Sequence, residues 1–139
     1  MIASLKGRGL VEGNVKGQMI ISSQPLSFLG GVDRLTGKIV DPKSDLYQEK
    51  LFNKILYIPR SVGSTVGAYV IYAICKNNLG PKAIICDKAD SIVVTGCAIA
   101  GIPLIDGIKY EKLSSHRAYA VINGTEGIIK IFDNKNDLY

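Results

Sequence analysis

The stretch from Pro59 to Gly67 holds the residue types best suited to chemistry. It reads Pro-Arg-Ser-Val-Gly-Ser-Thr-Val-Gly and joins an apolar run, typical of a buried strand, to a predicted helix. Backbone N–H groups at a helix start favour negative charge, so an anionic ligand or an oxyanion on Ser64 would be stabilised there. Gly63 lets the backbone bend without a side chain blocking the approach. The alternative is that Ser64 or Thr65 simply caps the helix.

Other catalytic patterns are weaker. No Gly-Lys-Ser/Thr follows the glycine, and no Gly-x-Gly-x-x-Gly fingerprint is present, so neither a Walker loop nor a dinucleotide site is predicted. The single histidine, His116, lies in a polar segment far along the chain, and we interpret it as a surface residue rather than as part of a triad. Asp33 and Asp106 are candidate acids or bases, although shaping turns is the commoner role of aspartate.

Composition predicts one globular domain over residues 1–139. Apolar residues make up 47% of the chain and charged residues 21%, and neither a repeat nor a linker divides the sequence. The first residues lack the pattern of a secretory signal, and no apolar run approaches the length of a membrane span. We therefore expect a cytoplasmic protein that does not bind a membrane.

The net charge of +5 comes from lysines and arginines scattered along the chain. Because no basic run is interleaved with aromatic residues, nucleic-acid binding is disfavoured, whereas binding of an anionic small molecule or of an acidic partner surface remains an open alternative.

The three cysteines, Cys75, Cys86 and Cys97, each lie in an apolar run, form no Cys-x-x-Cys pair and are odd in number. We predict three small buried side chains in a reducing compartment, and no metal ligands.

The start of the chain predicts strands and a structured loop. Apolar and β-branched residues predict strands over 3–10 and 14–21, joined by a short turn around Gly13. The segment 22–37 is dense in turn-forming residues, yet it holds four large apolar side chains that a solvated loop would not need: Leu26, Phe28, Leu29 and Val32.

A β-α-β unit is predicted around the serine turn. An apolar strand over 54–59 ends at a proline, helical spacing of apolar residues follows over 65–78, and a second strand covers 83–86. The stretch 90–100 fits a strand or a helix, and we favour a helix capped by Asp90.

The remaining pattern completes a mixed α/β chain. A short strand is predicted over 102–106, and 118–122 with 128–132 reads as a hairpin around an Asn-Gly-Thr-Glu-Gly turn.

Four ordered motifs carry a resemblance to a known family. They are Pro-Leu-Ser-Phe-Leu-Gly-Gly-Val-Asp at 25–33, Thr-Gly at 36–37, the serine turn at 59–67, and Gly-Cys-Ala-Ile-Ala-Gly-Ile-Pro at 96–103. In this order, and without a large insertion, they make the chain similar to the swivel-domain small subunits of the aconitase X family.

The resemblance implies an aconitase-like swivelling β/β/α domain, a barrel-like sheet flanked by helices. It also implies a hydro-lyase in which a large subunit holds a [4Fe-4S] cluster with its own cysteines, in a heterodimer or larger complex. The implied archaeal reaction dehydrates (R)-5-phosphomevalonate to trans-anhydromevalonate 5-phosphate, in a mevalonate route to isoprenoids. Ser64 matches the catalytic proton acceptor, and Arg60, Gly63 and Thr65 lie where the substrate would bind.

One departure leaves alternatives open. Aconitases proper follow their serine with a second serine and an arginine, whereas this chain has Thr65 and Val66, so the substrate carboxylate must bind Arg60 or the partner. Other members of the family dehydrate hydroxyproline-type acids, and a non-catalytic swivelling binding module would use Ser64 only as a cap. Ser27 and Asp33 occupy family-like positions without an assigned role.

Overall fold

The computed structural model describes residues 1–114 and 118–138. Its strands are β1 (Ala3–Lys6), β2 (Arg8–Val11), β3 (Asn14–Ile21), β4 (Lys54–Ile58), β5 (Ala83–Cys86), β6 (Leu104–Asp106), β7 (Tyr119–Asn123) and β8 (Ile128–Phe132). Its helices are α1 (Phe28–Gly31), α2 (Gly67–Lys76), α3 (Ser91–Ala100), α4 (Tyr110–Leu113) and the 3₁₀ turn η1 (Lys135–Leu138). The predicted mixed α/β class is confirmed.

The strands form one sheet that closes on itself. Their order is β1-β8-β7-β3-β4-β5-β6-β2, so the two end strands of the sheet are neighbours in the chain, separated by Gly7. At this junction the Gly7 N–H donates to the Gly127 carbonyl at 2.8 Å. The prediction of a single strand over 3–10 is wrong, because its two halves pair with β8 and with β6 at opposite ends of the sheet. The barrel-like sheet that the resemblance implies is present.

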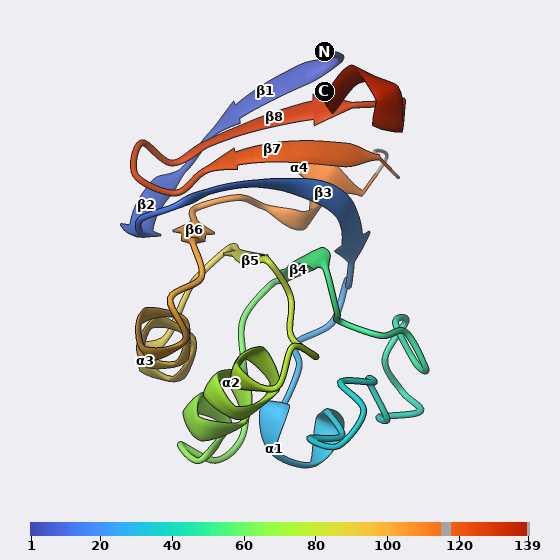
Figure 1. The fold of residues 1–139 in the computed structure, drawn as a ribbon, viewed down its shortest axis with the longest axis vertical. Coiled ribbons are helices and arrows are strands. Elements are labelled where there is room, and N and C mark those ends of the chain that lie inside the picture. Colours follow the sequence, from blue (N-terminus) through green and yellow to red (C-terminus); the bar gives the residue numbers. More distant parts are fainter. Residues whose placement is uncertain (115–117, 139) are drawn as a thin grey trace.

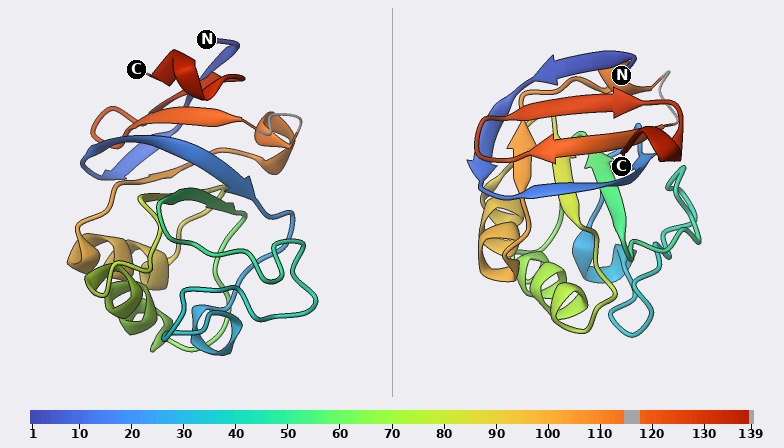
Figure 2. Two further views of the ribbon diagram at one scale, coloured as in Figure 1. Left: turned by 45° about the vertical axis from the view of Figure 1, so that its right-hand side comes forward. Right: turned by 45° about the horizontal axis from the view of Figure 1, so that its top comes forward.

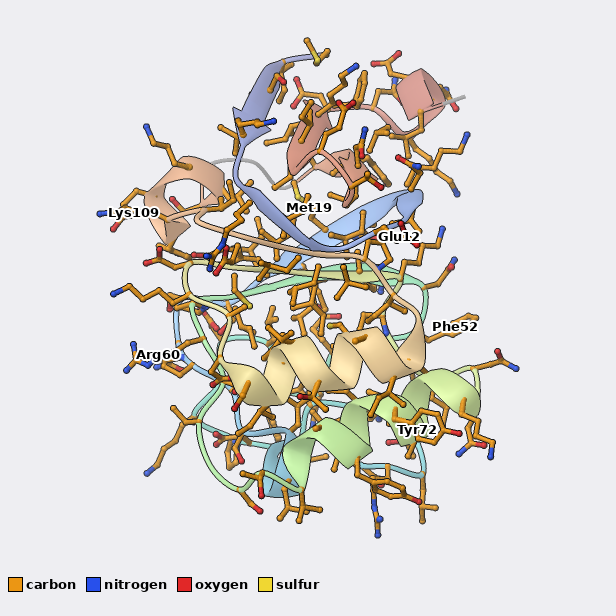
Figure 3. The ribbon with its side chains drawn as sticks, turned by 90° about the vertical axis from the view of Figure 1, so that its left-hand side faces the viewer. Glu12, Met19, Phe52, Arg60, Tyr72 and Lys109 are labelled. Atoms are coloured by element: carbon orange, nitrogen blue, oxygen red, sulfur yellow. The ribbon has the colours of Figure 1, made fainter. Side chains whose placement is uncertain are left out.

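The middle of the sheet is parallel. β3, β4, β5 and β6 run in the same direction, as the predicted β-α-β unit requires, and the hairpin of β7 and β8 is confirmed as antiparallel. The carboxyl ends of the parallel strands therefore meet at one edge, which is where α/β sheets usually place their sites. Figure 3 shows Arg60 and Lys109, which follow β4 and β6, at one end of the molecule, with Phe52 and Glu12 at the other.

The central strands are buried on both faces, so the molecule has three layers: the helices α2 and α3, the parallel strands, and the antiparallel strands. On β4, Leu56 and Ile58 pack in the cluster shared with α2 and α3, whereas Ile55 and Tyr57 pack against residues of β7 and β8. This period of two is that of a strand buried on both sides. The helices α2 and α3 lie below β4–β6, and the antiparallel strands β1, β7 and β8 lie above them (Figure 1), an arrangement that the two views of Figure 2 also show.

The two long helices fit the sequence pattern with small shifts. The helix predicted over 90–100 is confirmed as α3, and the carboxylate of Asp90 accepts the Val93 N–H at 3.1 Å. α2 begins at Gly67, slightly later than predicted, because the residues before it form a tight turn. No helix among the described residues is long and apolar enough to cross a membrane.

The segment after β3 packs beside α2. Leu26, Phe28 and Val32 are buried there, as expected for a structured loop, whereas Leu29 is exposed. Its short helix α1 is interrupted at Gly30, which has a φ of 90°. This segment therefore contributes both to the core and to the surface beside the serine turn.

Candidate functional site

The serine turn follows β4 at the carboxyl edge of the sheet. Leu26 anchors it through two backbone bonds, donating to the Arg60 carbonyl at 3.3 Å and accepting from the Val62 N–H at 3.1 Å. The turn therefore extends the parallel pairing of β3 with β4 beyond the regular strands. This is why the motif at 25–33, remote in sequence, lies beside Ser64.

Ser64 is exposed and caps the turn before α2 rather than the helix itself. Its hydroxyl accepts the Val66 N–H at 3.1 Å, and its carbonyl accepts the Gly67 N–H at 2.9 Å. Val66, the residue at the N-cap position, makes no side-chain cap bond. Within the described residues no hydrogen bond occupies the N–H groups of Ser64 and Thr65. The donors for an anion therefore lie in the turn that precedes the observed start of α2 at Gly67.

Gly63 has a φ of 95°, a conformation that L side chains rarely adopt. A Cβ at this position would lie 2.5 Å from the Ser27 hydroxyl oxygen, which itself donates to the Leu29 carbonyl at 2.7 Å. Both backbone geometry and the close approach of Ser27 therefore require glycine here. Ser27 thus lies against the turn.

The four predicted site residues share this one turn. Arg60 and Thr65 are exposed, as are Gly63 and Ser64, and Arg60 makes no ion pair among the described residues. Two surface clefts of about 300 and 350 Å³ lie elsewhere, one beside β3 and α4, the other at the start of β4. Neither includes a residue of the turn, so the roles of its four residues stay predictions.

The other candidate acids and bases have structural partners. Asp33 accepts the Leu35 N–H at 2.9 Å within a turn. Asp106 accepts two bonds of 2.9 Å from Arg8. Burial alone would raise the pKa of Asp106, but the bonds from Arg8 and from the Ala89 N–H hold it below the usual value. Asp106 is therefore part of an ion pair, and Asp33 shapes a turn.

His116, which the sequence pattern predicts to be a surface residue, lies outside the described residues.

The cysteines do not fit an iron–sulfur cluster. Cys86 and Cys97 are buried and Cys75 is half-buried. Burial raises the pKa of Cys75 to about 11 and places those of Cys86 and Cys97 well above the usual value, so all three stay protonated thiols. Among the described residues no three His, Cys, Asp or Glu side chains are grouped to hold a metal ion.

These thiols are expected to be inert in the folded chain. With a pKa of about 11, Cys75 is thiolate in about one molecule in a thousand at pH 8. We expect iodoacetamide to label it about 100-fold more slowly than in the urea-unfolded chain, as measured by mass spectrometry. Because folding raises the pKa of Cys75, its protonated thiol contributes to the free energy of unfolding at neutral pH. This contribution is lost as the pH rises above about 9. Equal labelling rates with and without urea would contradict this.

Sequence reasoning missed a buried contact beside the turn. The Ser61 hydroxyl, in a residue only 4% exposed, donates to Oδ2 of Asp90 at 2.5 Å. Asp90 was predicted as a helix cap, but its second oxygen binds a residue of the neighbouring strand's loop. Only the parallel pairing of β4 with β5 brings the two together.

Comparison with known proteins identifies the family. The model of the aconitase X swivel domain matches residues 4–131 of the chain. The chain belongs to the aconitase X swivel-domain family. The resemblance seen in the four sequence motifs is thus confirmed.

Relatives in this family are named phosphomevalonate dehydratase small subunit. The protein of that name from Pyrococcus furiosus is 54% identical over 127 residues, which cover 91% of this chain and 94% of the relative. That from Methanocaldococcus jannaschii is 43% identical over 129 residues, covering 93% and 98% of the two chains.

Two solved structures have the same fold as this chain. The crystal structure of Thermococcus kodakaraensis aconitase X in its holo form has a TM-score of 0.90 at 46% identity, covering 94% of this chain and 98% of that one. The solution NMR structure of a UPF0107 protein has a TM-score of 0.85 at 31% identity, covering 94% and 99%.

Proposed function

We propose that this chain is the small subunit of a phosphomevalonate dehydratase, a hydro-lyase that converts (R)-5-phosphomevalonate to trans-anhydromevalonate 5-phosphate. The names of the relatives support the substrate. The structural observation that carries the proposal is Ser64, which is exposed on a turn where no hydrogen bond within the described residues occupies the N–H groups of Ser64 and Thr65. Such a serine needs a second chain to complete its site.

The partner in this proposal is a large subunit that carries a [4Fe-4S] cluster. The relatives' name, small subunit, supports a larger partner. A cluster held elsewhere is supported by the protonated thiols, buried at Cys86 and Cys97 and half-buried at Cys75, and by the lack of a metal-binding group among the described residues. Residues 1–139 act as one swivelling domain that closes over the partner's site.

Ser64, as an alkoxide, accepts the proton from the carbon next to the substrate carboxylate, and the electron pair of that C–H bond forms the double bond as the tertiary hydroxyl leaves. The partner's cluster would act as a Lewis acid on the departing hydroxyl. A serine alkoxide is a strong base only where negative charge is stabilised and water is excluded. The N–H groups of Ser64 and Thr65 and the start of α2 supply that stabilisation, and closure of the subunits removes the water. Arg60, exposed and without an ion pair among the described residues, binds an anionic group of the substrate.

Reconstitution with the large subunit tests the proposal. We expect the mixed subunits to dehydrate (R)-5-phosphomevalonate, followed by mass spectrometry of the product, and to leave cis-3-hydroxyproline unchanged. Each subunit alone serves as the control and is expected to be inactive. Turnover of hydroxyproline alone would replace the proposed substrate by that of the alternative aconitase X reaction.

A further inference from the structure

We propose that Ser61 and Asp90 are positioning residues for Ser64, whose turn they fix through their hydrogen bond. This inference rests on the proposed function, because it assigns a part in the same reaction to two residues that act through the serine.

The hydrogen bond lies where three segments meet. Ser61 donates to Oδ2 of Asp90 at 2.5 Å, while Oδ1 of the same carboxylate accepts the Val93 N–H at 3.1 Å. Ser61 also forms an isolated parallel bridge with Leu26. The carboxylate therefore joins the serine turn to the start of α3, and the bridge joins it to the segment after β3.

This junction matters because Ser64 has little to fix it directly. Among the described residues its side chain bonds only to the Val66 N–H, at 3.1 Å, and Val66 belongs to the same turn. Further attachments between β4 and Ser64 are backbone bonds: the Pro59 carbonyl accepts the N–H groups of Asp87 and Lys88 at 3.1 Å, and Leu26 makes its two bonds to Arg60 and Val62.

Without the bond to Asp90, the turn would keep its backbone bonds at Pro59, Arg60 and Val62 and lose its side-chain attachment to the start of α3. A displacement of about 1 Å at a reacting group can lower a rate about 100-fold. A buried bond at Ser61 therefore controls the position of an exposed hydroxyl three residues later in the chain.

Figure 3 places this junction in the molecule. Arg60, the neighbour of Ser61, lies at the same end as Lys109, where the loops after β4 and β6 emerge. The start of α3 follows β5, between these strands in the sheet. The positioning bond thus spans two adjacent loops of the edge that carries Ser64.

The test uses the complete complex with its large subunit and (R)-5-phosphomevalonate. We expect Ser61→Ala and Asp90→Ala each to lower kcat about 10- to 100-fold, with KM changed less than about threefold. Asp90→Asn keeps an acceptor for the Val93 N–H and gains a donor for the Ser61 hydroxyl, so its kcat is expected to stay within about threefold of wild type.

The matched control is Ser22→Ala. It removes another buried hydrogen bond from a serine to an aspartate, the bond from Ser22 to Asp45 at 2.8 Å. It is expected to change kcat less than about twofold.

Two results would overturn the proposal. One is a kcat for Ser61→Ala within about twofold of wild type. The other is an equal loss in Asp90→Asn and Asp90→Ala, since the carboxylate charge rather than the geometry would then matter.

Hydrogen exchange on the same complexes gives a readout independent of turnover. Ser61→Ala is expected to speed exchange of the Val66 amide, which Ser64 caps, and Ser22→Ala is not. Unchanged exchange in Ser61→Ala would count against the positioning role. If the wild-type complex fails to dehydrate 5-phosphomevalonate, the proposed function fails, whereas the exchange result still decides the positioning role.

Discussion

Ser64→Ala is expected to lower kcat of the reconstituted enzyme by about 10²- to 10⁴-fold, with a small change in KM. The physical reason is that the methyl side chain of alanine cannot accept a proton. Loss of the cap to Val66 lowers the free energy of unfolding by only about 0.5 to 1 kcal/mol. Steady-state kinetics and urea unfolding of the same protein separate the two effects.

The control is Ser4→Ala, an exposed serine on β1 that pairs with Lys130 of β8, remote from the turn in the sheet order. Its kcat is expected to equal that of wild type. Should Ser64→Ala keep full activity and lose only stability, Ser64 would be a cap alone and the non-catalytic binding module would be the better reading of the chain.

Gly9→Ala is expected to reduce the free energy of unfolding by about 2 to 3 kcal/mol, because the added methyl group forces β2 away from the turn between β7 and β8. A Cβ on Gly9 would lie 2.1 Å from the carbonyl oxygen of Gly124 and 2.9 Å from that of Thr125. Both obstacles are backbone atoms of the turn between β7 and β8, so no side-chain rotation can relieve the clash. Urea unfolding followed by circular dichroism measures the loss.

Gly17→Ala is the matched control on β3. A Cβ there would meet its nearest neighbours, Asn53 and Lys82, at an ordinary 3.5 Å. Its free energy of unfolding is expected to stay within about 0.5 kcal/mol of wild type. Equal losses in the two variants would show that the close approach of Gly9 to the hairpin turn does not decide stability.

Local pattern was enough to predict several elements. The apolar run of β4, the helical spacing of α2 and the cap at Asp90 are each encoded by residues close together in the chain. The same holds for the hairpin of β7 and β8. Propensity, periodicity and capping depend on near neighbours, so these elements are visible in the sequence alone.

The break at Gly7 could not be predicted in this way. Residues 3–10 carry the pattern of one strand, and nothing local shows that its first half pairs with β8 and its second half with β6. Pairing between strands remote in sequence depends on the closure of the whole sheet. Tertiary structure therefore decided the topology where local pattern was uniform.

For the candidate site, too, some features follow from the sequence and others only from the tertiary structure. The sequence by itself determined its chemistry, since Arg60, Gly63, Ser64 and Thr65 are consecutive or nearly so and any fold must keep them together. Only the tertiary structure decided that Ser27 lies against Gly63, that Ser61 binds Asp90, and that the turn is open to solvent. The reason is that a turn's residue types follow from its own sequence, whereas its supports come from segments that only the packed sheet brings beside it.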